Sequence, residues 1–153
     1  MIFSPLEQFA INKIIPIFLG PVDFSFTNSS LLVVLSCLLA FSFYNMAIAG
    51  AKLVPSAWQS IAEFIYEFIY FTVLSENVKK NGNLYFPMLF SIFSFIFFCN
   101  LMGMVPYSFT VTSHIVVTLG LATMAFLAIN IIGVRTHGFH MLSLFLPSGA
   151  PIA

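Results

Sequence analysis

The stretch FPMLFSIFSFIFFCNLMGMV, residues 86–105, decides the fold, because it holds no charged side chain over twenty positions. At 1.5 Å per residue, a helix of this length reaches about 30 Å, which matches the hydrocarbon core of a bilayer. Pro106 follows directly, where a helix is expected to stop. The stretch therefore predicts a membrane-spanning helix.

Two further uncharged runs flank this one. Residues 31–49, LLVVLSCLLAFSFYNMAIA, precede it, and residues 115–134, IVVTLGLATMAFLAINIIGV, follow it and end at Arg135. Their Gly, Ser and Thr content is typical of helices that pack against neighbours in lipid. Because 60% of the 153 residues are hydrophobic and 7% are charged, we predict an all-α integral membrane protein with about three transmembrane helices.

Composition also excludes several classes of partner and site. Five Lys and Arg residues balance five Asp and Glu residues, so no basic surface for nucleic acid is expected. Cys37 and Cys99 lie deep in apolar runs, which favours small buried side chains over a disulfide or zinc ligands. His137 and His140 have no third ligand nearby, so we expect neither a metal nor a cofactor.

Residues 56–77, SAWQSIAEFIYEFIYFTVLSEN, are predicted to form one amphipathic helix in the plane of the membrane interface. A polar stripe at helical spacing comprises Ser56, Gln59, Ser60, Glu63 and Glu67, opposite Trp58, Ile61, Phe64, Ile65, Phe68 and Phe71. Pro55 before it suits the first turn of a helix. The two carboxylates are interpreted as part of a wetted helix face rather than as an acid–base pair.

The placement of positive charge supports an in-plane helix at 56–77. If this helix lies flat, Lys52, Lys79, Lys80 and Arg135 fall on one side of the membrane, and only Lys13 lies opposite. The N-terminus and the loop 107–113 then face the outer side. Residues 138–153, GFHMLSLFLPSGAPIA, are predicted to begin a segment that re-enters the membrane, and residues 1–153 to form a single membrane domain.

The run NGNLYFPMLFSIFSFIFFCNLMGMVPYSFTVTSHIVVT, residues 81–118, resembles subunit a of the F-type ATP synthase. PLEQF near the start, VPSAWQSIAEFIY, and GVRTHGFHMLSLFLPSGAP at the end occur in the same order as in that family, in its mitochondrial and alphaproteobacterial forms. The resemblance implies a non-catalytic stator subunit that couples proton translocation to ATP synthesis beside a ring of c subunits. The peripheral stalk and other Fo subunits would be its partners. The mitochondrial inner membrane is the expected location, with a bacterial inner membrane as the alternative.

The family's required arginine lies on a tilted helix beyond the LFLPSGAP block, and the sequence ends before it. Arg135 is no substitute, because it follows a span at the basic side, whereas the required arginine lies within the membrane. The chain thus resembles the N-terminal half to three-fifths of subunit a. We expect a separate chain to supply the remainder with its arginine; the alternative is that this sequence is part of one longer polypeptide.

The resemblance also implies a site. Asn100 near the outer end of the second span, and Thr112, Ser113 and His114 at the outer end of the third, would border the inlet half-channel for protons. Histidine exchanges protons near neutrality, with an ordinary pKa of about 6.5. The alternatives are an interhelical hydrogen bond for Asn100 and an interfacial, helix-capping role for His114. Asn130 is interpreted as a hydrogen-bonding partner of a neighbouring helix.

Other functions remain open at the level of the sequence. A fragment of another polytopic transporter or of a respiratory-complex subunit would show the same uncharged spans. Such a transporter is expected to contain inverted repeats or paired broken helices, and none is seen in the sequence. A purely structural role, with all proton contact in the remainder of subunit a, is the other alternative.

Overall fold

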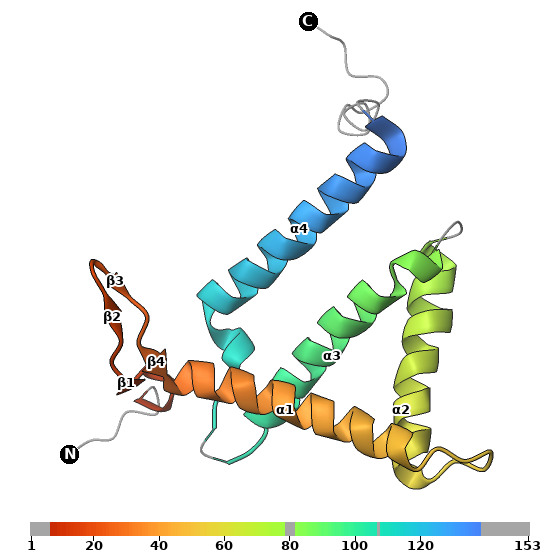
Figure 1. The fold of residues 1–153 in the computed structure, drawn as a ribbon, viewed down its shortest axis with the longest axis horizontal. Coiled ribbons are helices and arrows are strands. Elements are labelled where there is room, and N and C mark those ends of the chain that lie inside the picture. Colours follow the sequence, from red (N-terminus) through yellow and green to blue (C-terminus); the bar gives the residue numbers. More distant parts are fainter. Residues whose placement is uncertain (1–6, 79–81, 107, 139–153) are drawn as a thin grey trace, which may run out of the picture. The chain divides into compact units, whose positions relative to one another are not determined.

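The computed structural model describes residues 7–78, 82–106 and 108–138 (Figure 1). The predicted re-entering segment lies outside the described residues from position 139 onward, as do Lys79, Lys80 and His140. The chain divides into two compact units, residues 1–112 and residues 113–153.

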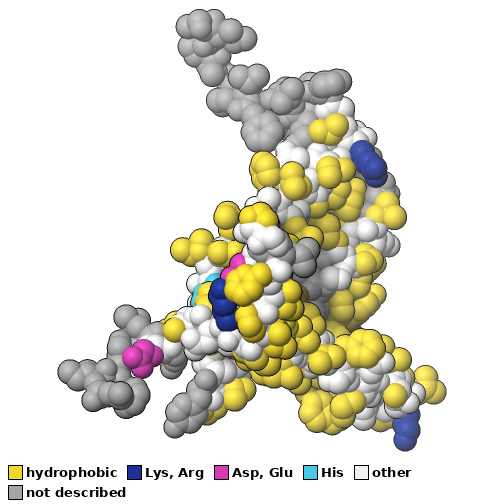
Figure 2. All heavy atoms as spheres, turned by 60° about the vertical axis from the view of Figure 1, so that its left-hand side comes forward, with side chains coloured by type: hydrophobic (Ala, Val, Ile, Leu, Met, Phe, Trp, Pro, Cys, Tyr) yellow, Lys and Arg dark blue, Asp and Glu magenta, His cyan; other side chains and the backbone are white. Residues whose placement is uncertain are grey.

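Three long apolar helices dominate the described residues: α1 (Asn28–Ala49), α3 (Phe86–Gly103) and α4 (Ile115–His137). Each is long and apolar enough to cross a membrane. They begin and end within three residues of the predicted spans, so the prediction of an all-α membrane protein with three spans is confirmed. In Figure 2, hydrophobic side chains are far more frequent than charged ones among the described residues on the face in view, as expected for surfaces that lie in lipid.

The first span begins with a capping box. The Thr27 hydroxyl accepts a hydrogen bond from the backbone N–H of Ser30 (3.3 Å), and the Ser30 hydroxyl accepts one from the backbone N–H of Thr27 (2.8 Å). These bonds satisfy backbone donors that have no partner inside the helix. The start of α1 is therefore fixed by side chains just before the apolar run.

Helices α1 and α3 pack against each other in the first unit. The hydroxyls of Tyr44 and Ser94 lie 2.9 Å apart and form a hydrogen bond between the two helices. The Phe43 and Phe98 rings add an aromatic contact, with centroids 5.5 Å apart. Cys99 is fully buried in this unit, as predicted.

The same prediction was wrong for Cys37, which is exposed on α1. An uncharged run predicts only that a helix is apolar all round. It does not indicate which side packs on a neighbouring helix and which side is left for lipid.

The predicted in-plane helix is made of two parts, α2 (Ala57–Glu67) and the π-helix η2 (Phe68–Ser75). Ser56 is the N-cap residue, so Pro55 precedes the helix instead of occupying its first turn. A 3₁₀ turn, η3 (Gly82–Leu84), then leads into α3. The helical prediction for residues 56–77 is thereby confirmed, and whether the helix lies flat stays a prediction.

The assignment of faces on α2 needs a correction. Gln59, which the pattern placed on the wetted stripe, is buried, because its side chain bonds the backbone N–H and carbonyl of Lys52 at 3.1 and 3.0 Å. Ile65 is buried as well, whereas Trp58 and Phe64 of the same predicted face are 55% and 70% exposed. The helix thus has a packed face, a polar face and a separate exposed apolar face.

The N-terminal segment forms short strands that the sequence did not predict. β1 (Lys13–Ile15) pairs with β4 (Phe26–Thr27), and β2 (Phe18–Leu19) pairs with β3 (Val22–Asp23), all antiparallel. Gly20 makes the turn between β2 and β3 with φ of +63°, a conformation that glycine adopts without strain. Asn28 joins this hairpin to α1 through its side chain, which bonds Asn12 N–H and the Ala10 carbonyl.

An ion pair spans the hairpin, because the Lys13 ammonium contacts the Asp23 carboxylate. Hydrogen bonds from Lys13 and then from Ser25 lower the pKa of Asp23 from 3.8 to about 2. The Lys13 ammonium also lies 5.3 Å from the centre of the Phe18 ring. The two charges of the hairpin therefore neutralise each other.

In the second unit, α4 begins after His114 and ends at His137. Arg135 and His137 lie in its last turn, where positive charge interacts favourably with the helix dipole. None of the described side chains of α4 is buried. The helix therefore presents apolar side chains all round.

Candidate functional site

Two of the four predicted site residues are in direct contact at the end of α3. Asn100 lies on the last turn of α3, and Thr112 belongs to the short 3₁₀ turn η4 (Val111–Ser113). The Thr112 hydroxyl donates a hydrogen bond to the Asn100 side-chain oxygen over 3.0 Å. Asn100 is exposed and Thr112 half-buried, so the pair lies at the surface of the first unit.

The chain after α3 folds back onto the helix that it leaves. The Ser108 hydroxyl donates to the carbonyls of Met102 and Val105, at 2.6 and 2.8 Å, and so satisfies acceptors at the helix end. Phe109 and Val111 are buried, with 5% and 0% of their surface exposed. The returning segment is thus packed and hydrogen-bonded, and it places Thr112 beside Asn100.

Gly103 makes this return possible. A Cβ atom at Gly103 would lie 2.1 Å from the Thr110 hydroxyl oxygen and 2.8 Å from the Thr110 Cα. Real Cβ atoms do not approach other atoms so closely, so only glycine lets the returning backbone pass at this point. The apolar pattern did not single out Gly103, because the close approach arises only when the loop closes on the helix.

Ser113 and His114 follow Thr112 directly. Ser113 ends η4, and His114 is the N-cap residue of α4. The His114 carbonyl accepts from the backbone N–H groups of Val117 and Thr118, at 3.1 and 3.2 Å, and its side chain makes no capping bond. His114 therefore caps α4 through its backbone carbonyl and not through its imidazole. A role of the imidazole in proton transfer stays a prediction.

The Asn130 side-chain N–H donates to the Phe126 carbonyl of the same helix over 2.7 Å. This bond uses one of the two N–H donors of the amide. A hydrogen bond from Asn130 to a neighbouring helix stays a prediction.

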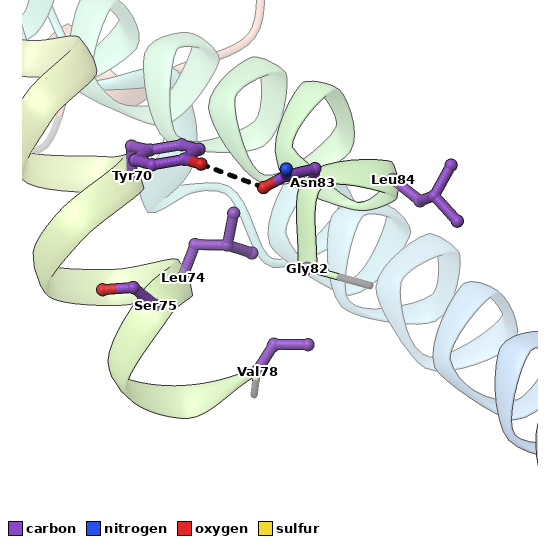
Figure 3. Close-up of a pocket in the computed structure, with 7 residues that line it drawn as sticks. All are labelled: Tyr70, Leu74, Ser75, Val78, Gly82, Asn83 and Leu84. Carbon is purple, nitrogen blue, oxygen red and sulfur yellow. Dashed lines mark hydrogen bonds between the residues drawn. The ribbon is translucent and has the colours of Figure 1, made fainter. Parts of the chain in front are cut away.

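Two of the cavities elsewhere in the first unit lie beside η2 and α2. One of about 420 Å³ lies where η2 leads toward α3, and the Tyr70 hydroxyl donates to the Asn83 side-chain oxygen across it (3.1 Å, Figure 3). The other, of about 450 Å³, is lined by Tyr44, Ala47, Ile48, Ala51, Gln59, Ala62, Glu63, Tyr66 and Phe90. Among the residues that the structure describes, no group of three or more His, Cys, Asp or Glu side chains could hold a metal ion.

Comparison with known proteins identifies the family. Residues 28–153 match the model of the ATP synthase A chain. ATP synthase subunit a of Rhodospirillum rubrum is 49% identical over 97% of this chain and 61% of its own length, and that of Marchantia polymorpha is 46% identical over 99% and 62%. The protein of the same name from Chondrus crispus is 45% identical over the full chain and 60% of its own length. The chain thus spans about three-fifths of the length of these curated relatives, and it belongs to the ATP synthase A chain family.

Proposed function

We propose that this multi-pass membrane protein is part of the Fo stator of an F-type ATP synthase and helps to conduct protons to and from the ring of c subunits. It does not catalyse a reaction by itself. Its contribution is a set of membrane-embedded side chains and the water that they admit. Membership of the ATP synthase A chain family and three helices long enough to span a bilayer support this proposal.

The proposed inlet is built on Asn100, Thr112, Ser113 and His114. The observation that carries it is the 3.0 Å hydrogen bond from Thr112 to Asn100, which joins two of these residues across the turn after α3. An exposed amide and a hydroxyl at a helix end bind water, and water shortens the apolar distance that a proton must cross. That distance matters because a charge at the bilayer centre costs at least about 2.5 to 3.5 kcal/mol.

The expected partners are the c subunits, the peripheral stalk and other Fo subunits. We propose the mitochondrial inner membrane as the location, with a bacterial inner membrane as the alternative. That a separate polypeptide supplies the rest of subunit a with its arginine also stays a prediction. Intact-mass measurement on the purified complex decides this point: a 17.0 kDa species supports a separate chain, and one longer continuous chain contradicts it.

Replacing Asn100 with Leu tests the inlet. The change keeps the approximate volume but removes the group that accepts from Thr112, so proton-driven ATP synthesis is expected to slow while the complex still assembles. Asn45→Leu is a matched control, because Asn45 on α1 is also an exposed amide, and its side-chain N–H donates to the Phe41 carbonyl of its own helix (2.7 Å). Synthesis rates and blue-native gels of both variants provide the measurement.

Replacing His114 with Phe tests the imidazole separately. If the side chain relays protons, the synthesis rate of the variant should depend less on outer pH than that of the parent. Unchanged synthesis in assembled Asn100→Leu and His114→Phe complexes would contradict the proposed inlet. The purely structural alternative would then describe this part of subunit a.

A further inference from the structure

The cavity of about 450 Å³ between α1, α2 and α3 has no part in the proposed proton inlet. It is formed by the last turns of α1, one side of α2 and the first turns of α3, and all its lining residues belong to the first unit. Lys52, the first charged residue after α1, follows three residues beyond the end of this span. The cavity therefore lies at the depth of lipid headgroups on the predicted basic side.

The lining combines one carboxylate with aromatic and aliphatic side chains. Glu63 is the one charged residue in it, and Tyr44, Tyr66 and Phe90 supply three rings. The Tyr44 and Phe90 ring centres lie 5.3 Å apart, and those of Tyr66 and Phe90 lie 6.5 Å apart. A carboxylate beside aromatic rings attracts an ammonium group by charge and by cation–π interaction.

Glu63 is held in place by a buried neighbour. Gln59 is 8% exposed, and its amide nitrogen donates to the Glu63 carboxylate over 2.8 Å and to the Lys52 carbonyl over 3.0 Å. Since Gln59 also accepts from the Lys52 backbone N–H, its side chain bonds both backbone groups of Lys52 and links them to the carboxylate. The negative charge at the cavity is therefore positioned by the packed face of α2.

The depth of the cavity suits a lipid. Tyr44 lies five residues before the end of α1 and Phe90 four residues after the start of α3, which places them about 6 to 8 Å inside the helix ends. The lining is apolar where it opens to the outside, since Ile48, which lines the cavity, is 73% exposed. This space accommodates a headgroup with the glycerol and the first carbons of an acyl chain.

We propose that this cavity binds the ammonium headgroup of a zwitterionic phospholipid, with Glu63 as its counter-ion and the Tyr44, Tyr66 and Phe90 rings against the lipid. Phosphatidylethanolamine and phosphatidylcholine share this chemistry. They differ in whether the ammonium group can also donate hydrogen bonds to the carboxylate.

The test compares two glutamates on one helix. Glu63→Gln removes the negative charge but keeps an oxygen that accepts from Gln59. Glu67→Gln is the matched control, because Glu67 is exposed one turn later and does not line the cavity. The purified complex that contains this chain is reconstituted into vesicles of phosphatidylglycerol with either phosphatidylethanolamine or phosphatidylcholine. Lipids that remain after mild detergent extraction are then counted by native mass spectrometry.

We expect Glu63→Gln to retain the zwitterionic lipid about tenfold less well than the parent and Glu67→Gln to retain it equally well, because the amide that replaces the Glu63 carboxylate lacks the negative charge that attracts the ammonium group of either lipid. The vesicle that shows the loss identifies the headgroup. Equal retention in the parent and Glu63→Gln would overturn the proposal, as would an equal loss in both variants.

A second pair of variants and a cross-link address the other possible occupant. Ala62→Phe fills the cavity without removing charge and should release the lipid, whereas Ala57→Phe, on the exposed start of α2, should not. A carbodiimide joins a carboxylate to a primary amine that it touches. A cross-link from Glu63 to phosphatidylethanolamine supports the proposal, and a cross-link to a lysine of another polypeptide would overturn it.

Discussion

Replacing Gly103 with Ala should open the turn after α3. The added Cβ would lie 2.1 Å from the Thr110 hydroxyl oxygen and 2.8 Å from the Thr110 Cα, and the second of these clashes is with backbone, which no side-chain rotation relieves. The returning segment must therefore move away from α3. This movement breaks the bond from Thr112 to Asn100.

The size of the effect follows from these clashes. Overpacking of this kind costs about 1 to 3 kcal/mol, and a lost hydrogen bond adds about 1 kcal/mol or less. Alanine regains little helix propensity here, because Gly103 is the last residue of α3. A local destabilisation of about 1 to 4 kcal/mol corresponds to roughly 5- to 900-fold faster exchange of the amides that open with the turn.

Hydrogen exchange of the peptide covering 104–114, in the purified complex, measures this opening. Gly120→Ala is the matched control, because an added Cβ at Gly120 on α4 would meet no atom within 4 Å among the described residues, the backbone of its own helix aside. Alanine there should stabilise its helix by about 0.5 to 1 kcal/mol, an effect of the opposite sign.

Adding Thr110→Gly to Gly103→Ala removes the clashes with the Thr110 side chain but leaves the clash with its backbone, so it should restore only part of the protection. Unchanged exchange in Gly103→Ala would refute the reasoning.

Three further predictions concern other parts of the chain. Tyr44→Phe removes the interhelical hydrogen bond to Ser94 and should lower the free energy of unfolding in detergent by about 0.6 to 1.7 kcal/mol. If this bond is the cause, adding Ser94→Ala to Tyr44→Phe should cause no further loss. Lys13 lowers the pKa of Asp23 to about 2, so the ionised carboxylate stabilises the hairpin fully above pH 3.8, and this stabilisation is lost as the pH falls toward 2. The protection of the β1 and β4 amides against hydrogen exchange should therefore fall over this pH range in the parent but not in Asp23→Asn. A cysteine at Glu67 should react with a membrane-impermeant reagent added on the basic side, and reaction only from the other side would contradict an in-plane α2.

The spans were predictable because each is a long apolar run bounded by charge, proline or a cap. The contact between Asn100 and Thr112 was also within reach, since two helices joined by a short loop bring their adjoining ends together. The hairpin at residues 13–27 was missed, because its strands are two or three residues long and leave no run of alternating side chains.

Packing between elements was the part that the sequence did not indicate. Helical spacing placed Gln59 on a polar stripe, but the loop that carries Lys52 covers it. Cys37 and Cys99 occupy equally apolar surroundings in the sequence, and only the packing of α1 on α3 leaves one exposed and buries the other. A periodic pattern describes one element, whereas burial depends on what lies against it.

The lengths of the three spans differ, and this bears on membrane thickness. With 18 residues, α3 extends about 27 Å, whereas α1 and α4, with 22 and 23 residues, extend about 33 to 35 Å. A hydrocarbon core of about 30 Å is thus slightly too thick for α3 and too thin for upright α1 and α4. Tilting accommodates the long helices, but the mismatch at α3 favours a bilayer that thins around it. Such thinning brings the aqueous boundary closer to Asn100, so a membrane of shorter-chain lipids should favour the hydrated state of this helix end.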